Sequence, residues 1–355
     1  MSRKLLKNLE NKPNMPKATE TLLEIDLNAL ENNYKYLISK LKPETKVLAV
    51  VKAFGYGSDS VVIAKELVEL GVDYFAVAYA NEGETLRNAK IETPILVLHP
   101  LPVNFEVIVD RCLEPSIYSR KMLEEFIAFA EEKKQINYPV HLKFNTGLNR
   151  LGFVASDVDY IAETLLKTNS VKVKSAFSHL AASEDLKLKD FTMGQIESFR
   201  KISEELSEKL EYKPLLHCAN TSGILNYPEA HFDMVRTGIG LYGFGNDKEE
   251  NKYLKPVGTL KTVISQIHTV QKSESVGYNR GFIAEEITRS ATLPIGHADG
   301  IPRSYGKGKG WVTIHGKKAS ILGTSAEELS AAINSISYEL ITAVSQRVKR
   351  VVCRN

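Results

Sequence analysis

The chain has 355 residues, of which 43% are apolar and 25% charged, a balance typical of soluble globular proteins. This composition excludes extensive disorder, collagen-like repeats and a coiled coil, and the length suits one large α/β domain with a smaller companion. The 46 basic residues barely outnumber the 43 acidic ones, so the net charge is only +3. Such a weak excess gives no electrostatic basis for nucleic-acid binding. We interpret the short basic run at 347–350 as a solvated surface.

The cysteines and the lengths of the apolar segments indicate the cellular compartment of the protein. Three cysteines lie far apart without a CxxC pair, which favours reduced thiols over a disulfide framework. The first twenty residues lack the continuous apolar segment of a secretory signal. No apolar stretch approaches the ~20 residues that a membrane helix needs. We therefore expect a soluble, cytoplasmic protein with no membrane or nucleic-acid partner and no metal site.

In chain order, residues 1–18 form a polar lead-in, and residues 19–245 alternate short apolar runs with amphipathic stretches. Helical periodicity marks several of the intervening stretches, at 60–71, 121–134 and 191–210. Strand-like runs occur at 46–51, 74–79, 94–99, 115–119, 138–144, 172–180, 214–220 and 232–240. Eight strands interleaved with helices fit a closed (β/α)8 barrel, the TIM barrel, better than an open doubly wound sheet.

Residues 246–355 have a different pattern. The stretches 257–279 and 310–322 alternate apolar and polar residues, and a Gly- and Lys-rich turn precedes the second. This alternation predicts antiparallel strands with one solvated face, and hence a smaller, mostly β C-terminal domain. A capping-box pattern at 325–328 predicts the start of a helix.

Lys52 ends the first strand-like run, which places its amine at the C-terminal mouth of the barrel, where active sites of this fold lie. The preceding run is almost purely apolar, so the lysine is partly desolvated. Desolvation lowers the pKa of a lysine and favours the neutral, nucleophilic amine. Taken alone, Lys52 is equally well interpreted as a barrel lysine paired with a neighbouring acid.

The last strand-like run leads into a GxGxxG pattern that begins at Gly238. A dinucleotide site does not fit, because no helical pattern follows and no acidic residue stands ~20 positions further on. We interpret the glycines as an anion cup, because barrels often bind phosphate with the loops after strands seven and eight. Asn220 and Thr221, at the end of the seventh run, would supply the other half. A plain glycine turn is the alternative.

Further polar residues stand at strand ends. His179 closes the sixth run, and Lys143, Asn149 and Arg150 cluster around the end of the fifth. A lone histidine is usually a satisfied core residue, but His179 lies at the expected functional end. A mouth lysine, a phosphate cup and a strand-end arginine together indicate pyridoxal phosphate held as a Schiff base. Residue spacing alone does not name the cofactor.

Several segments, in order along the chain, closely resemble the alanine racemases, which are pyridoxal-phosphate enzymes of fold type III. The resemblance runs from about residue 20 to the end of the chain, so it is far more specific than any single motif. Its segments are AVVKAFGYG, KFNTGLNRLGF, HCANTSGIL, MVRTGIGLYGF, VGYNRGF, PIGHADGIPR and ISYELITAVSQRVKR.

The resemblance implies racemisation of alanine by two-base proton transfer on a pyridoxal-phosphate aldimine, supplying D-alanine for peptidoglycan. Lys52 would form the aldimine with the cofactor and act as one base. Tyr278 would be the opposing base, reaching in from the second subunit of a homodimer. Two bases are needed because a single immobile base would tend to return the same enantiomer. A phenol with a pKa near 10 needs assistance to act as a base at neutral pH.

The resemblance also implies cofactor contacts. Arg236 would face the pyridine nitrogen without taking up its proton, since arginine has no accessible deprotonated form. Arg150 would hold the phenolic oxygen and approach the substrate carboxylate. Lys143 aligns with a lysine that is often carbamylated and orients that arginine, and His179 would lie beside the ring. The phosphate would be held by Tyr56, Thr221, Gly238, Ile239 and Tyr338.

The chain departs from the family pattern in two places. His297 stands where tyrosine is common at the active-site entrance. After Gly323 the family continues with a Cys-Met-Asp segment that helps to bind the substrate carboxylate, whereas this chain passes directly to Thr324 and the last helix.

The apparent shortening leaves open a catalytically impaired or non-catalytic pyridoxal-phosphate binder. A racemase of another small amino acid, such as serine, is a second alternative. A decarboxylase of the same fold type would need a C-terminal cysteine motif, which the sequence lacks.

Overall fold

The computed structural model describes residues 20–247, 249–302, 305–322 and 342–354. The chain divides into two compact units: Leu27–Val257, and a second unit formed by Met1–Asp26 together with Gly258–Asn355. These limits differ from the expected boundaries after residues 18 and 245. Residues 22–26 group with the C-terminal segment, and the barrel unit continues to Val257.

The barrel unit contains a closed sheet of eight parallel strands, in which the last strand pairs with the first. Each expected strand-like run contains or overlaps one strand, so the (β/α)8 prediction is confirmed. Most of the runs are rich in apolar residues because both faces of these strands are covered, the interior by barrel side chains and the exterior by helices. The strands are β2 (Lys46–Val50), β3 (Tyr74–Val77), β4 (Ile95–Val97), β5 (Glu114–Ile117), β6 (Tyr138–Lys143), β7 (Val171–Phe177), β8 (Leu215–His217) and β9 (Met234–Thr237).

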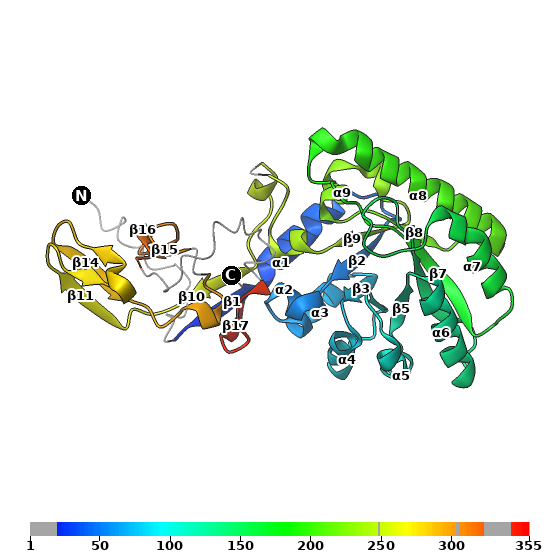
Figure 1. Cartoon of the computed structure of the whole chain (residues 1–355), viewed down its shortest axis with the longest axis horizontal. Coiled ribbons are helices and arrows are strands. Elements are labelled where there is room, and N and C mark those ends of the chain that lie inside the picture. The colour runs from blue at the N-terminus through cyan, green and yellow to red at the C-terminus, as the bar shows by residue number, and fades with distance from the viewer. Residues whose placement is uncertain (1–19, 248, 303–304, 323–341, 355) are drawn as a thin grey trace, which may run out of the picture. The chain divides into compact units, whose positions relative to one another are not determined.

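Helices connect the strands, and in Figure 1 α3 to α8 follow one another along the outer edge of the barrel. In the longest, α8, the buried residues Ile196, Phe199 and Leu206 recur at helical spacing and form the face that packs inward. The α-helices are α1 (Leu27–Ile38), α2 (Lys52–Tyr56), α3 (Ser60–Glu69), α4 (Ala80–Asn88), α5 (Phe105–Asp110), α6 (Arg120–Glu132), α7 (Val158–Leu165), α8 (Lys189–Leu210) and α9 (Thr221–Asn226).

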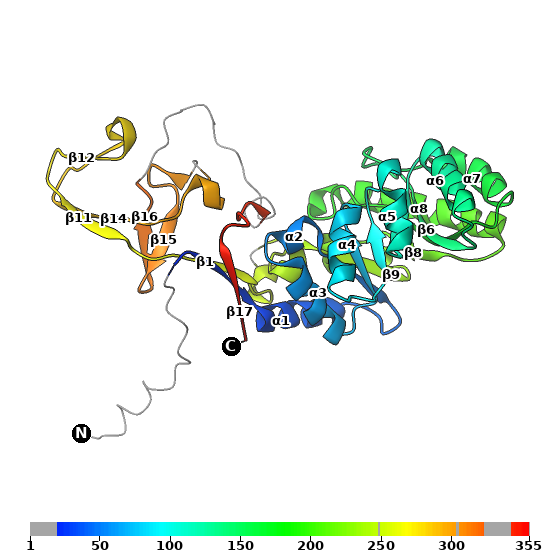
Figure 2. The ribbon, with the colours of Figure 1, turned by 90° about the horizontal axis from the view of Figure 1, so that it is seen from below.

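The second unit is built from short strands. The strand β1 pairs antiparallel with β10 and parallel with β17, as Figure 2 shows for β1 and β17. Three further pairs are two-stranded: β11 with β14, β12 with β13, and β15 with β16. The strands are β1 (Leu22–Asp26), β10 (Gly258–Lys261), β11 (Gln266–Val270), β12 (Ser275–Val276), β13 (Phe282–Ile283), β14 (Thr288–Thr292), β15 (Trp311–Ile314), β16 (Lys317–Ser320) and β17 (Lys349–Cys353).

The basic run at 347–350 is more than a solvated surface. Arg347 donates two hydrogen bonds, at 2.6 and 2.8 Å, to the buried carboxylate of Asp299. Arg350 donates to the backbone carbonyls of Ser345 and Val348. Hydrogen bonds of these two arginines therefore stabilise the start of β17 against other residues of the same unit. Among the described residues, no helix is both long and apolar enough to cross a bilayer.

Candidate active site

The barrel brings most of the expected site residues to one end, where the C-terminal ends of its strands meet. Lys52 directly follows Val51 at the end of β2, Lys143 is the last residue of β6, and Arg236 lies near the end of β9. His179 follows β7 by two residues. The charges of Lys52, Lys143, Arg150 and Arg236 all lower the pKa of His179, so these groups lie close together. We call this end the mouth of the barrel.

The backbone after Lys52 turns with the opposite hand to an ordinary helix. Ala53, Phe54, Gly55 and Tyr56 have φ values of 53°, 56°, 62° and 52°. A left-handed conformation costs roughly 1–2 kcal/mol for each residue other than glycine. Such a turn persists only where its surroundings hold it.

Glu82, in the first turn of α4, holds this left-handed turn. Its carboxylate accepts hydrogen bonds from the amide of Ala53 at 2.7 Å and from the amides of Ala78 and Tyr79 at 2.6 and 3.2 Å. Glu82 therefore ties the segment that carries Lys52 to the end of β3. Sequence reasoning missed this residue, although an acidic residue three positions into a helix is a recognisable capping signal.

The environment of Lys52 favours its neutral amine. Burial lowers the pKa of Lys52, and the nearby charge of Arg150 lowers it further, while the carboxylate of Glu82 opposes the shift. A lowered pKa increases the fraction of neutral amine at physiological pH. Lys52 thus has the character expected of a nucleophile toward carbonyl groups.

The loops after β8 and β9, where the sequence predicts an anion cup, are joined by hydrogen bonds, and we call them the cup. The hydroxyl oxygen of Thr221 accepts hydrogen bonds from the amides of Gly238 and Gly240 at 3.3 and 3.2 Å. A Cβ atom at Gly238 would overlap the Tyr56 hydroxyl, so glycine is required for this approach. The Tyr56 ring is itself buried and stacks on Tyr242, with ring centroids 4.5 Å apart. Ile239 begins a short 3-10 helix, Ile239–Tyr242, rather than the long helix of a dinucleotide site.

Asn220 stabilises the loop after β8 through hydrogen bonds of its side chain. Its side-chain oxygen accepts hydrogen bonds from the Gly223 amide and the Ser183 hydroxyl, both at 2.8 Å. The residue thereby caps α9 and fixes the start of the helix on which Thr221 lies. Tyr338, the other expected phosphate ligand, lies outside the described residues, as do Gly323 and the expected cap at 325–328.

Arg236 is buried and held by two of its three nitrogens. Nη1 donates to Nδ1 and the carbonyl oxygen of His217, at 2.9 and 3.1 Å. Nη2 donates to the carbonyl oxygens of Ser178 and Cys218 at 2.6 and 3.0 Å and to Nδ1 of His179 at 3.2 Å. No described residue accepts a hydrogen bond from Nε, so this donor remains for a ligand. Burial lowers the pKa of Arg236 to about 10, which leaves it protonated at neutral pH.

The surroundings of Lys143 and His179 lower the pKa of both side chains. Lys143 is only 7% exposed, and burial together with the charges of Arg150 and Arg236 lowers its pKa to about 8. Burial and the same arginines lower the pKa of His179 well below its ordinary value. His179 is therefore neutral and accepts from Arg236. Arg150 itself is exposed, in a loop shaped by the side chain of Asn145, which accepts from the Asn149 amide at 2.9 Å.

Tyr278 and His297 belong to the second unit. Tyr278 follows Gly277, whose φ of 83° forms the turn between β12 and β13, and the tyrosine side chain is 80% exposed. His297 begins a short 3-10 helix, His297–Asp299, and is also exposed. The mouth described above consists of residues of the barrel unit, so it includes neither Tyr278 nor His297.

The groups at the mouth fit pyridoxal phosphate. The hydroxyl groups of Tyr56 and Thr221 in the cup suit a phosphate. The open Nε of Arg236 suits a ring nitrogen that accepts a hydrogen bond, and the partly neutral Lys52 amine suits an aldehyde. The excess of positive charge at the mouth complements the phosphate of such a cofactor and the carboxylate of an amino acid.

Comparisons with known proteins agree with this geometry. Residues 25–245 match the family profile described as alanine racemase, N-terminal domain, and residues 257–326 match that of the alanine racemase C-terminal domain. Alanine racemase 1 of Clostridium acetobutylicum is 30% identical over 370 aligned positions, covering 94% of this chain and 95% of the relative. Alanine racemase 2 of Oceanobacillus iheyensis is 32% identical, covering 94% of each chain.

Solved structures give the same result. The alanine racemase from D-cycloserine-producing Streptomyces lavendulae has a TM-score of 0.87 at 27% identity, covering 96% of this chain and 98% of that one. The alanine racemase from Bartonella henselae, solved with covalently bound pyridoxal phosphate, has a TM-score of 0.83 at 26% identity, covering 95% and 100%. The chain belongs to the alanine racemase family.

Proposed function

We propose that this protein is a pyridoxal-phosphate-dependent alanine racemase, an isomerase that interconverts L- and D-alanine. The observation that carries the proposal is the barrel mouth, which brings together a lysine with a lowered pKa, the cup formed by the loops after β8 and β9, and a buried arginine donor. Within this proposal the protein is cytoplasmic and supplies D-alanine for peptidoglycan.

We assign the two proton transfers to Lys52 and Tyr278. When bound, pyridoxal phosphate supplies an aldehyde that bonds to amines and a conjugated ring that withdraws electrons from the α-carbon of an amino acid. Nζ of Lys52 then takes or returns the α-proton on one face of the substrate, and Oη of Tyr278 does so on the other. Two groups on opposite faces are what inversion at the α-carbon requires.

Tyr278 acts in the site of a second copy of the chain in this proposal, which makes the active form a homodimer. The 80% exposure of its side chain supports this, because an exposed tyrosine on a hairpin is free to enter a neighbouring molecule. Its phenol needs positive charge nearby to act as a base, and the cationic mouth supplies such charge.

Arg236 and Arg150 orient the reactants. Nε of Arg236 donates to the ring nitrogen of the cofactor and keeps its own proton, which limits electron withdrawal by the ring and hence side reactions such as transamination. Arg150 binds the carboxylate of the substrate and the phenolic oxygen. Tyr56, Thr221, Gly238 and Ile239 hold the phosphate, with Asn220 fixing the loop; Tyr338 remains a sequence-based assignment.

A catalytically impaired homologue is the second candidate. The alignment with Alanine racemase 1 spans 370 positions, more than the 355 residues of this chain, so the relative carries residues that this chain lacks. The C-terminal domain profile matches only as far as residue 326, close to the apparent shortening after Gly323. A racemase of another small amino acid, such as serine, would share the same mouth.

A chiral assay separates these candidates. Purified protein with added pyridoxal phosphate receives L-alanine or L-serine, and the D-enantiomers are measured. We expect D-alanine, with a rate at least about 10²–10⁴-fold lower in Lys52→Ala, the range that one positioned base contributes. Lys65→Ala, an exposed lysine on α3, is the matched control and should retain full activity. Cofactor bound to Lys52 without formation of D-alanine would instead establish the impaired homologue. D-serine as the main product would identify the protein as a serine racemase.

A further inference from the structure

Five polar side chains form a continuous hydrogen-bonded series inside the barrel. They come one each from five adjacent strands: Glu114 from β5, His141 from β6, Ser175 from β7, His217 from β8 and Arg236 from β9. His141, Ser175 and His217 are fully buried, and the two end residues are 9% and 5% exposed. We call these five residues the relay.

Every link of the relay has hydrogen-bond length. Nη1 of Arg236 lies 2.9 Å from Nδ1 of His217, and Nε2 of His217 lies 2.8 Å from Oγ of Ser175. Oγ of Ser175 lies 2.6 Å from Nδ1 of His141, and Nε2 of His141 lies 2.6 Å from Oε2 of Glu114. The pairing register places His141 directly opposite Ser175, so the barrel sheet itself sets this link.

The two ends of the relay fix the position of every proton in it. Arginine only donates, so Nδ1 of His217 accepts and its proton lies on Nε2. That proton goes to Ser175, whose hydroxyl then donates to its other partner, Nδ1 of His141. His141 is left with its proton on Nε2, directed at Glu114, and an ionised carboxylate only accepts. The donor at Arg236 and the acceptor at Glu114 therefore both require that each hydrogen bond is donated in the direction from Arg236 to Glu114.

This order has a consequence at the mouth. Burial and the charge of Arg236 lower the pKa of His217 well below its ordinary value, so the ring is neutral and offers a lone pair to Arg236. The acceptors bound to Arg236 are carbonyl oxygens and histidine nitrogens, none of them a carboxylate. Among the described residues, the hydrogen-bonded series that starts at Nη1 of Arg236 ends at a carboxylate, that of Glu114.

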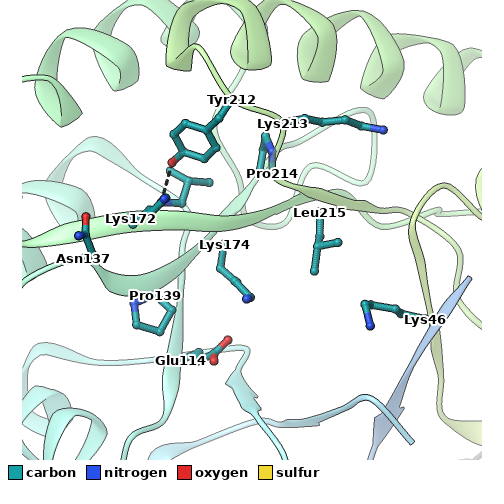
Figure 3. A pocket seen from close by; sticks show the side chains of 11 residues that line it. Lys46, Glu114, Asn137, Pro139, Lys172, Lys174, Tyr212, Lys213, Pro214 and Leu215 are labelled. Atoms are coloured by element: carbon teal, nitrogen blue, oxygen red, sulfur yellow. Dashed lines mark hydrogen bonds between the residues drawn. The ribbon is translucent and has the colours of Figure 1, made fainter. Parts of the chain in front are cut away.

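The far end of the relay opens on a cavity of about 640 Å³ at the N-terminal ends of the strands, opposite the mouth. Figure 3 shows Glu114 at this cavity, with the side chains of Lys174 and Lys46 around the same space. Positive charge there complements a carboxylate. The relay thus spans the barrel from a lysine-lined cavity at one end to Arg236 at the other.

We propose that Glu114, His141 and Ser175 are positioning residues that hold His217 in one tautomer and thereby place Arg236 at the cofactor ring. The role of Arg236 toward the ring rests on the proposed function, whereas the order of protons within the relay does not. None of the three residues is among those assigned to hold the cofactor, and sequence reasoning missed all of them.

Nitrogen NMR of histidine-labelled protein tests the proton order without any cofactor. We expect His141 and His217 to be neutral, each with its proton on Nε2 and a bare Nδ1. A doubly protonated His141, or a proton on Nδ1 of His217, would overturn the proposal. This result stands whether or not the protein racemises alanine, so it separates failure of the relay from failure of the proposed function.

Ser175→Ala tests whether the relay acts on the cofactor site. We expect roughly tenfold weaker binding of pyridoxal phosphate, a shifted absorption maximum of the bound cofactor and a lower kcat, because His217 loses the acceptor for its Nε2 proton. Ser116→Ala is the matched control. Ser116 is also fully buried, lies on β5 opposite His141, and its hydroxyl has no partner among the described residues. Equal effects of the two substitutions would contradict the proposal.

Glu114→Gln tests transmission along the relay. In the wild-type background we expect a smaller loss, about threefold, in the same three properties and a change in the nitrogen shifts of His217. In the Ser175→Ala background the same substitution should have no further effect, since the link is already broken. Glu66→Gln, a buried glutamate on α3, controls for loss of a buried charge. Additive effects of Glu114→Gln and Ser175→Ala would refute transmission.

Discussion

Lys52 and Lys143 both stand at the C-terminal ends of barrel strands, after β2 and at the end of β6, but their surroundings give them different chemistry. Burial lowers the pKa of both amines. At Lys52 the carboxylate of Glu82 opposes the shift, whereas the charges that act on Lys143 are those of Arg150 and Arg236, which add to it. Lys143 therefore has a pKa of about 8 in a site where a negative group would be stabilised by two arginines. A carbamate would supply that group, because a neutral amine bonds to carbon dioxide and releases a proton.

We predict that Lys143 is carbamylated in bicarbonate buffer. With a pKa of about 8, about half of the amine is neutral at pH 8 but only about 1% at pH 6. Protein in ¹³C-bicarbonate should therefore give a carbamate carbon signal at pH 8 that nearly disappears at pH 6. The signal should be absent in Lys143→Met and unchanged in Lys65→Met. A signal that persists in Lys143→Met would show that another amine carries it.

The same pKa shift makes stability depend on pH. The unfolded lysine has a pKa near 10.5, above the folded value, so the unfolded chain binds more protons between pH 8 and 10.5. Without carbon dioxide, the contribution of Lys143 to the free energy of unfolding rises with pH across this window and is least favourable below it. Carbamylation would remove this cost, because the modified side chain no longer takes up the proton that burial disfavours.

At the scale of elements, the mouth depends on a contact between two segments that are distant in sequence. The left-handed turn in α2 is held by Glu82 of α4, and both are attached to neighbouring strands, β2 and β3. Local residue preference does not explain the turn, since Ala53 and Phe54 disfavour positive φ. The turn is therefore a property of the assembled barrel.

We predict that Glu82→Gln destabilises the barrel by about 1–3 kcal/mol. One glutamine oxygen replaces two carboxylate oxygens, so at least one amide among Ala53, Ala78 and Tyr79 loses its acceptor. Chemical denaturation followed by far-UV circular dichroism measures the loss. Glu84→Gln is the control: Glu84 lies on the same helix and pairs with Arg111 near the surface, so its loss should stay within about 0.5 kcal/mol. Equal losses would mean that the turn does not depend on Glu82.

Features that depend on residues close together in the sequence were predictable, and features that depend on residues far apart in the sequence were missed. The eight barrel strands were predictable because most are short, mainly apolar runs that alternate with amphipathic stretches, and Lys52, Lys143 and Arg236 because they stand at strand ends. The strand β1 was not assigned to the C-terminal unit, because its partner β17 lies more than 300 residues away and no local pattern encodes that pairing. His141 and His217 sit inside apolar runs, where only the three-dimensional register reveals that they join one series.

At the scale of the whole molecule, the two units differ in how much core they contain. Most of the buried apolar side chains belong to the barrel unit. Among the described residues of the second unit, the buried apolar side chains are Leu23, Ile25, Val270, Ala284 and Val348. Two-stranded sheets such as β11 with β14 and β15 with β16 are marginally stable by themselves. The second unit therefore depends on further contacts, which a homodimer would provide.

Exposed apolar side chains on the second unit support this view. Ile267, Ile283, Ile287 and Trp311 are each about half exposed or more. Tyr278 is exposed in the same unit, and in the proposed dimer its hydroxyl lies in a neighbouring molecule. Dimer formation and completion of the active site are thus one event in the proposed function.

We predict that the second unit unfolds before the barrel and that dimerisation delays its unfolding. Trp311 is the single tryptophan of the chain and lies on β15, so its fluorescence reports on the second unit, whereas far-UV circular dichroism reports mainly on the barrel helices. The fluorescence midpoint should fall at lower denaturant than the circular dichroism midpoint. It should rise with protein concentration, because mass action stabilises a dimer. Coincident midpoints that are independent of concentration would mean that the second unit is stable in the monomer, and the case for a dimer built on its exposed residues would fail.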